Sequence, residues 1–333
     1  MKCSRHLGFT LVELLVVIGI IAVLATVFFV ASGNATDSAR SAQCMTNLRS
    51  LALAANSYAM EKGNYPPAGS SESVSLEKNK PIYSSNPGWI SWLCANNYSG
   101  GHDFQGAAKA SSHQSNGTMP FYGNGNRDEE SFAITNGAIW IACGRNRSLY
   151  TCPEHVRYRK SQNMPEPLWS YVMNMCFGYD TKGGRAQISA TGGSSFKYND
   201  PKLRAEKRLM FAELPTFDPF SDNLEPVQDG KDESADAILQ FEQVSKGKSG
   251  GQGAIGAGGS KETIGFPHKM SKGRYCANIV FADGHTEKVV LSRNATKEDV
   301  AKLTCYLCNG WDVTITSKGW QMAEHADEVY EEQ

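Results

Sequence analysis

The sequence has no excess of charge of either sign. Lys and Arg number 33 against 34 Asp and Glu, and the pI is near 6.7. Nucleic-acid-binding proteins present a basic surface to the phosphates, so this balance gives no electrostatic reason to expect such a partner. Long apolar runs are also missing after the first 31 residues, and the mean hydropathy of the 333 residues is −0.39. The body of the chain is therefore expected to be a water-soluble domain.

The one long apolar run lies at the N-terminus, over residues 9–31. It contains a single charge, Glu13, and at about 1.5 Å per residue a helix of this length crosses the roughly 30 Å hydrocarbon layer. Lys2 and Arg5 precede it, which predicts a cytoplasmic N-terminus and an exported body. A secretory signal is the alternative, but its apolar region is only about 7–15 residues long, and no A-x-A cleavage site follows the run. The sequence therefore predicts one transmembrane helix over residues 9–31.

The start of this run carries the string GFTLVE, residues 8–13, after a short basic leader. It resembles the processing site of type IV prepilins and type II secretion pseudopilins. The resemblance implies that prepilin peptidase cuts after Gly8 and that Phe9 is then N-methylated. Glu13 occupies the position of the glutamate typical of that family. A carboxylate in lipid needs an opposite charge, and the amine of Phe9 on an adjacent subunit could supply it, so Glu13 is expected to set the register of a filament.

The remaining chain divides into a helix and a head. Residues 32–62 contain no proline, and apolar residues recur there at 3/4 spacing, which predicts an amphipathic continuation of the helix. Gly63 and the prolines that follow end it. The predicted organisation is a leader over 1–8, a membrane span over 9–31, an amphipathic helix over 32–62 and a globular head over 63–333.

The head shows strand and turn patterns rather than helical ones. Residues 277–282 and 285–290 flank an Asp-Gly pair, Asp283-Gly284, which predicts a β-hairpin, and residues 131–142 around an Asn-Gly pair are a second candidate. Thr296 and Asp299 resemble a capping box that begins a short helix. We predict an α+β, pilin-like fold in which the long helix packs on an antiparallel β-sheet head with long loops.

A second resemblance involves His268 and, after fourteen intervening residues, Asp283-Gly284. The pair is similar to the C-terminal signature of the prepilin-type processing-associated H-x9-DG domain, as are YTCPE at 150–154 and SYVMN at 170–174. The spacing departs from nine residues, which argues against a fixed His–Asp contact, and the resemblance implies no role for the motif. A metal site or catalytic dyad is one interpretation, but no nucleophile in a recognisable context accompanies the pair. A hairpin turn with a histidine that bonds nearby backbone is preferred.

Cysteine usage points to an oxidising compartment. The chain has 9 cysteines, of which Cys3 lies in the leader, and the even remainder in an exported chain favours disulfides. Cys44, on the long helix, is expected to be an unpaired thiol. The other candidates for disulfides are Cys94, Cys143, Cys152, Cys176, Cys276, Cys305 and Cys308. The last two form a C-x-x-C that could be a zinc half-site or a redox pair, but a lone C-x-x-C without a βαβ context favours structural disulfides.

Two features suggest ligands. Acidic residues in the segment 218–236 could bind calcium, with Asp229, Asp232 and Asp236 as candidates, but their spacing does not match an EF-hand loop and a solvated loop is preferred. Trp89, Trp92 and Tyr98 could stack on sugars, although aromatic residues in a head domain are more often core. No other metal or cofactor is predicted.

These observations favour a non-enzymatic subunit of a pilus-like filament in type II secretion or a type IV pilus-like machine. Expected partners are prepilin peptidase, other pilin-like subunits, an inner-membrane assembly platform and an ATPase. The expected location is the bacterial inner membrane, with one span and a periplasmic head, or the cell surface after assembly. The alternative is a membrane-anchored binding module for a glycan or another ligand, with a patch over residues 81–127. A hydrolase that uses His268 and Asp283 ranks last.

Overall fold

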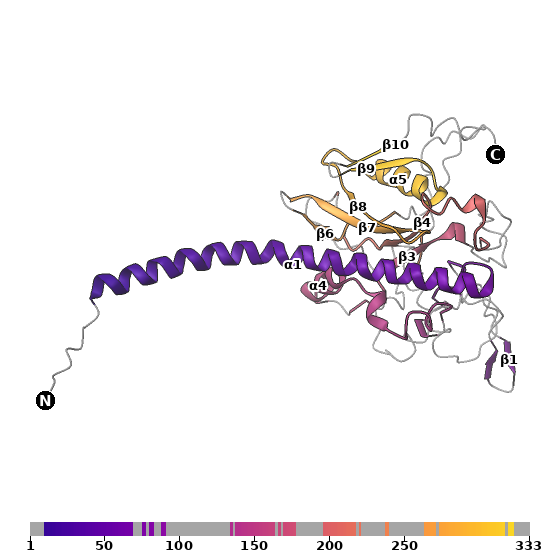
Figure 1. The fold of residues 1–333 in the computed structure, drawn as a ribbon, viewed down its shortest axis with the longest axis horizontal. Helices are drawn as coiled ribbons and strands as arrows, with labels where there is room; N and C mark the ends of the chain where they lie inside the picture. Colours follow the sequence, from indigo (N-terminus) through magenta and orange to yellow (C-terminus); the bar gives the residue numbers. More distant parts are fainter. Residues whose placement is uncertain are drawn as a thin grey trace.

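The protein is a long helix with a globular head built on its C-terminal half (Figure 1). The computed structural model describes residues 10–68, 75–77, 80–82, 88–90, 134–135, 137–163, 166–167, 169–177, 196–217, 220, 237–239, 263–270, 273–316 and 319–322, without the side chains of 27–35, 75–77, 80–82, 238 and 322. The leader, Gly8 and Phe9 lie outside these residues.

Helix α1 (Leu11–Lys62) is 52 residues long, about 78 Å at 1.5 Å per residue. It begins with a capping box in which Thr10 and Glu13 bond each other, and it ends at Gly63, whose φ of 81° suits glycine. The predicted end of the helix at residue 62 is confirmed. In the part of the chain that the structure describes, no helix combines the length and the hydropathy needed to cross a membrane.

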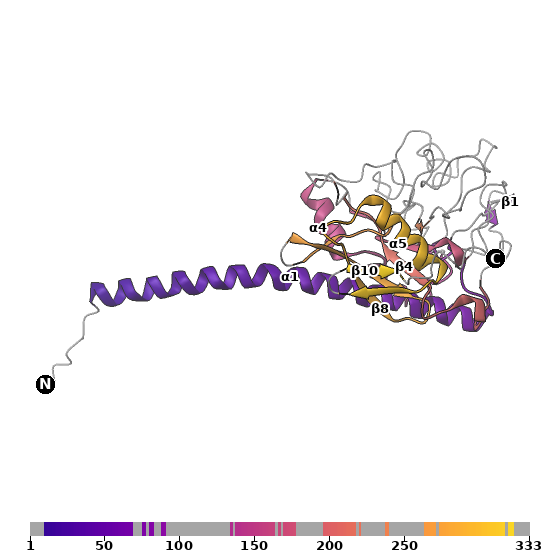
Figure 2. The same cartoon turned by 90° about the horizontal axis from the view of Figure 1, so that it is seen from above.

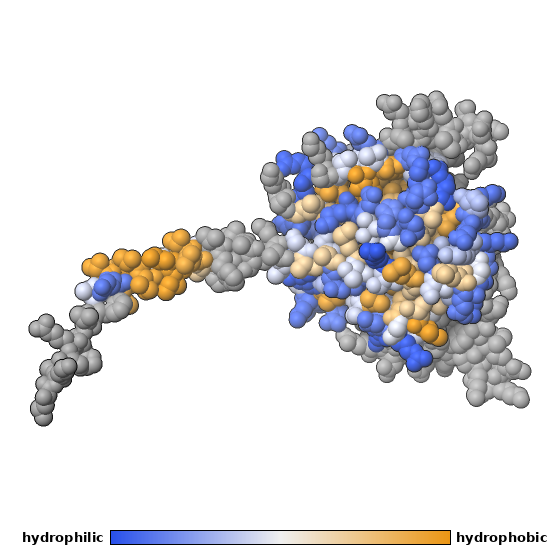
Figure 3. All heavy atoms as spheres, viewed as in Figure 1, coloured by the Kyte–Doolittle hydropathy of each residue, from blue (hydrophilic) through white to orange (hydrophobic). Residues whose placement is uncertain are grey.

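The two ends of α1 have different surroundings. Apolar side chains between Leu11 and Leu24 are exposed by 44–78%, and Figure 3 shows this apolar segment projecting from a largely polar head. Further along, the predicted amphipathic stripe is confirmed, since five of its members are completely buried against the head: Leu48, Leu51, Ala52, Ala55 and Ala59.

The main sheet has six strands, in the order β5-β3-β4-β7-β6 with β8 also paired to β7. Their bounds are β3 (Tyr171–Asn174), β4 (Leu209–Glu213), β5 (Ile238–Leu239), β6 (His268–Lys269), β7 (Tyr275–Phe281) and β8 (Thr286–Val290). All pairs are antiparallel except β3–β5, which is parallel. The α+β, pilin-like arrangement is confirmed, with this one parallel pair as a departure.

The sheet lies between α1 on one face and α5 (Lys297–Asn309) on the other, an order visible in Figure 1 and, from above, in Figure 2. The capping box expected for α5 is present between Thr296 and Asp299. Beside the sheet, η3 (Arg147–Tyr150) and α4 (Pro153–Ser161) pack against α1, and η4 (Met175–Phe177) and η5 (Pro201–Leu203) are single turns. The described residues also form two small hairpins: β1 (Ser75–Glu77) with β2 (Lys80–Ile82), and β9 (Val313–Thr316) with β10 (Gly319–Met322).

One of the two predicted hairpins is confirmed. Strands β7 and β8 pair around Asp283-Gly284, where Gly284 has a φ of 91°. The candidate over residues 131–142 is wrong in its described part, because residues 134–135 are helical and residues 137–145 form turns. The backbone of Gly137 passes so close to that of Trp89 that a Cβ would lie 2.3 Å from the Trp89 carbonyl oxygen, so this glycine serves a close approach rather than a hairpin turn.

Candidate functional site

Four metal-ligating side chains meet beneath α1: Cys44, Cys152, Glu213 and His268. Their donor atoms all lie within 4.8 Å of one another. The most exposed of the four residues, His268, is only 2% exposed. Burying a carboxylate and an imidazole costs free energy unless they are paired, and in this cluster Glu213 and His268 lie 2.7 Å apart. We refer to these four residues as the Cys–His–Glu cluster.

The sheet register explains why Glu213 and His268 are neighbours. Strand β4 pairs with β7 as far as Ala212 opposite Ile279, and β6 continues on the same side of β7 with His268 opposite Cys276. Glu213 ends β4 and His268 begins β6, so their side chains lie on either side of the short gap between the two strands. Residues 277–278 of β7 lie in this gap and pair with no other described strand on that side.

Two helices supply the thiols. Cys44 lies on the buried face of α1, and Cys152 is the N-cap residue of α4. The two sulfur atoms lie within 4.8 Å of each other. The cluster therefore connects the long helix with α4 and with both strands.

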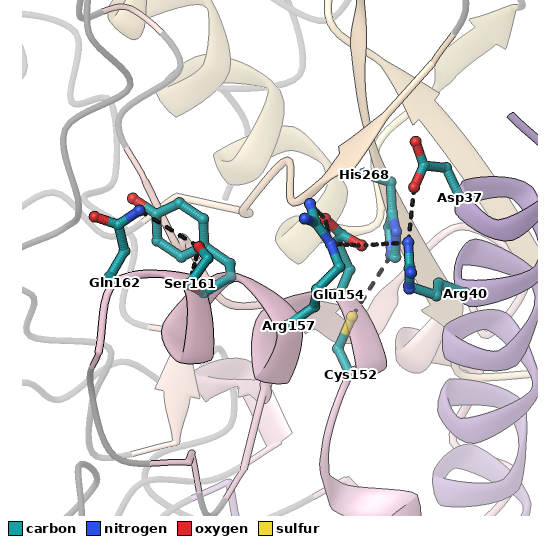
Figure 4. Close-up of polar contacts among 9 residues, drawn as sticks. Asp37, Arg40, Cys152, Glu154, Arg157, Ser161, Gln162 and His268 are labelled. Atoms are coloured by element: carbon teal, nitrogen blue, oxygen red, sulfur yellow. Dashed lines mark hydrogen bonds and ion pairs between the residues drawn. The ribbon is translucent and has the colours of Figure 1, made fainter. Parts of the chain in front are cut away.

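The His268 ring presents one nitrogen to two partners. Its Nε2 lies 2.7 Å from Oε1 of Glu213 and 3.7 Å from Sγ of Cys152. Figure 4 shows Cys152 at the start of α4 and its contact with His268. The three side chains thus converge on one point rather than forming a chain through the two ring nitrogens.

The electrostatics of the cluster follow from its burial. Burial alone would lower the pKa of His268, but the charge of Glu213 and the hydrogen bonds with Cys152 and Glu213 raise it to about 10. Burial raises the pKa of the Cys44 thiol. For Cys152, burial opposes ionisation, but hydrogen bonds with Cys44 and His268 lower its pKa. Cys152 is therefore the thiol that ionises first.

A polar shell fixes the orientation of the cluster. The backbone N–H of Asn278 donates to Oε2 of Glu213 at 2.7 Å, in the gap between β4 and β6, which leaves Oε1 to face His268. The Asn278 amide also bonds the backbone carbonyl of Ser41 on α1 at 3.3 Å. Another α1 residue, Asn47, donates to the Tyr171 hydroxyl at 3.3 Å.

Charged residues beside the cluster hold α4 against α1. Arg40 on α1 pairs with Asp37 at 2.7 Å and with Glu154 of α4 at 3.5 Å, and Arg157 also pairs with Glu154 (Figure 4). Glu154 is buried, so these pairs are less screened than surface ones. The YTCPE string thus contributes both Cys152 and Glu154 to the contact with α1.

The structure separates the two halves of the predicted His–Asp motif. His268 faces Glu213, while Oδ1 of Asp283 lies 2.6 Å from Nδ1 of His285. The two motif residues flank opposite ends of β7, roughly 20 Å apart at about 3.3 Å per residue. A hydrolase dyad of His268 and Asp283 is therefore wrong. The preferred alternative is a histidine that bonds nearby backbone. It is also wrong, because the contacts of His268 are with the side chains of Glu213 and Cys152.

The expected disulfides are not formed among the described cysteines. Cys44, Cys143, Cys152, Cys176 and Cys276 are free, buried thiols, and Cys305 and Cys308 are buried thiols on α5. Cysteine packs as a small apolar residue, and these positions belong to the core and its margins. Cys44 is a buried thiol as expected. Cys94 lies outside the described residues.

The structure shows no ligand site at the other residues predicted to bind ligands, because most of them lie outside the described residues. The calcium candidates Asp229, Asp232 and Asp236 lie outside the described residues, as do Trp92, Tyr98 and most of the expected glycan patch over residues 81–127. Trp89 is described and completely buried, with its ring stacked on Tyr150 at 5.8 Å. It is a core residue and not a surface sugar platform.

Comparison with protein families yields two matches. Residues 3–29 match the prokaryotic N-terminal methylation motif. Residues 34–213, more than half of the chain, match the family described as "Protein of unknown function (DUF1559)". The chain belongs to this family. No curated protein matches, and no solved structure matches.

The DUF1559 match and the cluster overlap. Cys44, Cys152 and Glu213 all lie within the matched residues, with Glu213 at the last of them, and His268 follows further along the chain. The methylation motif indicates processing by prepilin peptidase, with Gly8, Phe9 and Glu13 inside the matched segment. Processing and the cluster thus involve separate parts of the chain.

Sequence reasoning did not identify Glu213 or the pairing of Cys44 with Cys152. One signal was available: LMFAE, residues 209–213, is an apolar strand that ends in a carboxylate. A charge at the end of a fully buried strand indicates a buried partner. The identity of that partner depends on the β4–β7–β6 register, which the sequence does not show.

His155, on α4 beside this site, makes the stability of the protein depend on pH in a way that can be measured. It is buried, its Nδ1 lies 2.9 Å from Oγ of Ser170, and burial followed by the charge of Arg159 lowers its pKa from 6.5 to about 3. Between pH 6.5 and about 3, the His155 ring is therefore protonated in the unfolded chain and neutral in the folded chain. The stability that His155 contributes is present above pH 6.5 and is lost as the pH falls through this range.

We expect the difference in unfolding free energy between wild type and His155→Gln to shift by about 1.4 kcal/mol between about pH 7.5 and pH 5.5. Wild type should lose more stability on acidification, because glutamine does not titrate. Denaturant unfolding of both proteins at the two pH values measures the shift. A difference that does not change with pH would contradict the assignment of a neutral, buried His155.

Proposed function

We propose that this protein is a membrane-anchored, non-enzymatic subunit of a pilus-like filament. Prepilin peptidase would remove the leader after Gly8 and methylate Phe9. The head would then face the periplasm, or the outside of the cell after assembly. Copies of this chain or other pilin-like subunits would pack around the N-terminal half of α1, helped by an inner-membrane platform and an ATPase.

The exposed apolar half of α1 carries this proposal. Leu11 is 78% exposed, and even Val17, the least exposed large apolar residue of the segment, is 44% exposed. A helix that is apolar on every side is stable only when it is surrounded by lipid or by other helices. The described residues of the head leave this half of the helix uncovered (Figure 1), so lipid or neighbouring subunits would cover it.

The separation of the two halves of α1 suits a filament. The buried stripe from Cys44 to Ala59 attaches the helix to the head, and the segment from Leu11 to Leu24 remains free for neighbours. Because α1 is about 78 Å long, the head lies well away from the N-terminal stem that neighbouring subunits would cover. Each subunit could thus contribute its stem to a common core and its head to the outer surface.

Mass spectrometry of the N-terminal peptide, with protein isolated from its own membranes, tests the proposal. We expect the mature chain to begin with N-methylated Phe9, and we expect Gly8→Ala to abolish cleavage, because the proposed cut follows this glycine. The matched control is Ser4→Ala, which changes the leader but leaves the GFTLVE string at residues 8–13 intact. An intact Met1 terminus, or a cut beyond Ala31, would overturn the proposal.

A further inference from the structure

The Cys–His–Glu cluster has the donor set and the compactness of a metal site. A tetrahedral zinc ion with bonds of about 2.0–2.3 Å holds its ligand atoms about 3.3–3.8 Å apart. The donor atoms of Cys44, Cys152, Glu213 and His268 all lie within 4.8 Å of one another, and the Cys152 Sγ to His268 Nε2 distance is 3.7 Å. The Glu213 to His268 distance, at 2.7 Å, is shorter than this range and must lengthen by about half an ångström.

The single nitrogen of His268 distinguishes a metal site from a catalytic triad. In a Cys–His–carboxylate triad the thiol and the carboxylate contact opposite ring nitrogens, because the carboxylate orients the base. Here Nε2 faces both Cys152 and Glu213. Ligands of one metal ion converge in this way on a common point. The four residues are also at most 2% exposed, which leaves a substrate no access to the thiol.

The surrounding hydrogen bonds orient the ligands as the second shell of a metal site does. The Asn278 N–H donates to Oε2 of Glu213 at 2.7 Å and its side-chain amide donates to Oε1 at 3.3 Å, which orients Oε1 towards His268 at 2.7 Å. Asn47, which lies on α1 like Cys44, donates to the Tyr171 hydroxyl at 3.3 Å. Neither arrangement is needed for packing alone, since each brings further polar groups into the core.

The ligand types select zinc among the common metals. Calcium and magnesium prefer oxygen ligands, of which the cluster offers one carboxylate. Two thiolates and an imidazole suit zinc, and a closed set of four protein ligands without an open position is typical of a structural site. We infer that Cys44, Cys152, Glu213 and His268 bind one structural zinc ion that fixes helix α1 to the head.

Such a site would join four elements that are distant in sequence. Cys44 comes from α1, Cys152 from the start of α4, Glu213 from the end of β4 and His268 from β6. The two thiols lose their protons to solvent when the metal binds, and the metal then contributes directly to folding. The inference stands on these residues alone and is independent of the filament proposal.

Metal analysis of the detergent-solubilised full chain, purified under reducing conditions, tests the site. We expect about one zinc per chain by inductively coupled plasma mass spectrometry. Cys44→Ser and Cys152→Ser should each lower zinc affinity at least about tenfold. The matched control is Cys143→Ser, which replaces a buried thiol outside the cluster and should keep the metal.

Two further measurements cover variants that fold poorly. A strong chelator should lower the unfolding temperature of wild type and Cys143→Ser but not that of Cys152→Ser, a comparison that is unaffected by the starting stability. Cobalt added to the chelated wild type should produce the visible bands of tetrahedral cobalt together with thiolate charge-transfer bands. Metal-free wild type that does not take up cobalt would overturn the inference, and so would zinc that remains in the Cys44→Ser, Cys152→Ser double variant.

A disulfide is the competing state of the two neighbouring thiols. Intact mass analysis of protein alkylated without reduction, taken directly from membranes, counts the free thiols. A Cys44–Cys152 disulfide in the native protein would overturn the inference, because a disulfide removes both thiolate ligands. Free thiols together with bound zinc would support it.

Discussion

Glu13→Ala is expected to reduce incorporation of the subunit into filaments at least about tenfold, since a lost charge pair between partly buried groups costs roughly 2 kcal/mol or more. Glu13 has two separable roles in the structure and the proposal. Its carboxylate bonds the N–H and hydroxyl of Thr10 at 2.8 Å each, which caps α1. The same carboxylate is the proposed partner of the Phe9 amine on a neighbouring subunit.

Two matched variants separate these roles. Glu13→Gln keeps a side chain that completes the capping box but removes the charge, whereas Thr10→Ala removes the cap and keeps the charge. Incorporation is measured by cross-linking that does not use cysteine, or by recovery of sheared filaments. Either amount is normalised to the processed subunit in the membrane. The charge model expects Glu13→Gln to fail and Thr10→Ala to assemble. The reverse pattern would show that Glu13 acts only on its own helix.

Trp89→Ala is expected to destabilise the head by about 3–5 kcal/mol, the range for removal of a large buried aromatic side chain. Trp89 is completely buried, stacks on Tyr150 at 5.8 Å and meets the Phe211 ring edge-on at 4.9 Å. Its indole N–H donates to the Ala237 carbonyl at 3.0 Å, so the variant also leaves that acceptor without this bond.

Chemical denaturation of the detergent-solubilised chain measures the change in unfolding free energy, with the loss of head structure as the signal. Trp89→Phe is the control, since it retains an aromatic ring and should cost markedly less. A sugar-stacking role for Trp89 would instead predict a loss of ligand binding with unchanged stability. A cost below about 1 kcal/mol for Trp89→Ala would contradict its place in the core.

Much of the architecture was predictable because its signals are local. The end of α1 is encoded by Gly63, whose positive φ suits a helix C-cap, and the β7–β8 hairpin by the Asp283-Gly284 turn. The start of α5 follows from Thr296 and Asp299, which lie three residues apart. Each of these features depends on side chains and backbone within a few residues, so the pattern alone specifies the conformation.

The candidate site was not predictable in the same way. The sequence marked His268 but associated it with Asp283, the acidic residue next along the motif, and it marked Cys152 only as a disulfide candidate. Glu213 and Cys44 are 55 and 108 residues distant from His268 and Cys152 respectively, by their numbering. Such partners are chosen by strand register and by helix docking, which follow from the packing of the whole head.

The sequence by itself determined the N-terminal processing motif, the long helix with its apolar and amphipathic halves, and the α+β class of the head. These properties depend on composition and short-range spacing along one chain segment. Only the tertiary structure decided that the thiols of Cys44 and Cys152 face a carboxylate and an imidazole. The reason is that β6 continues the ladder of β7 where β4 ends, and α1 lies across that junction, so four distant residues share one buried space.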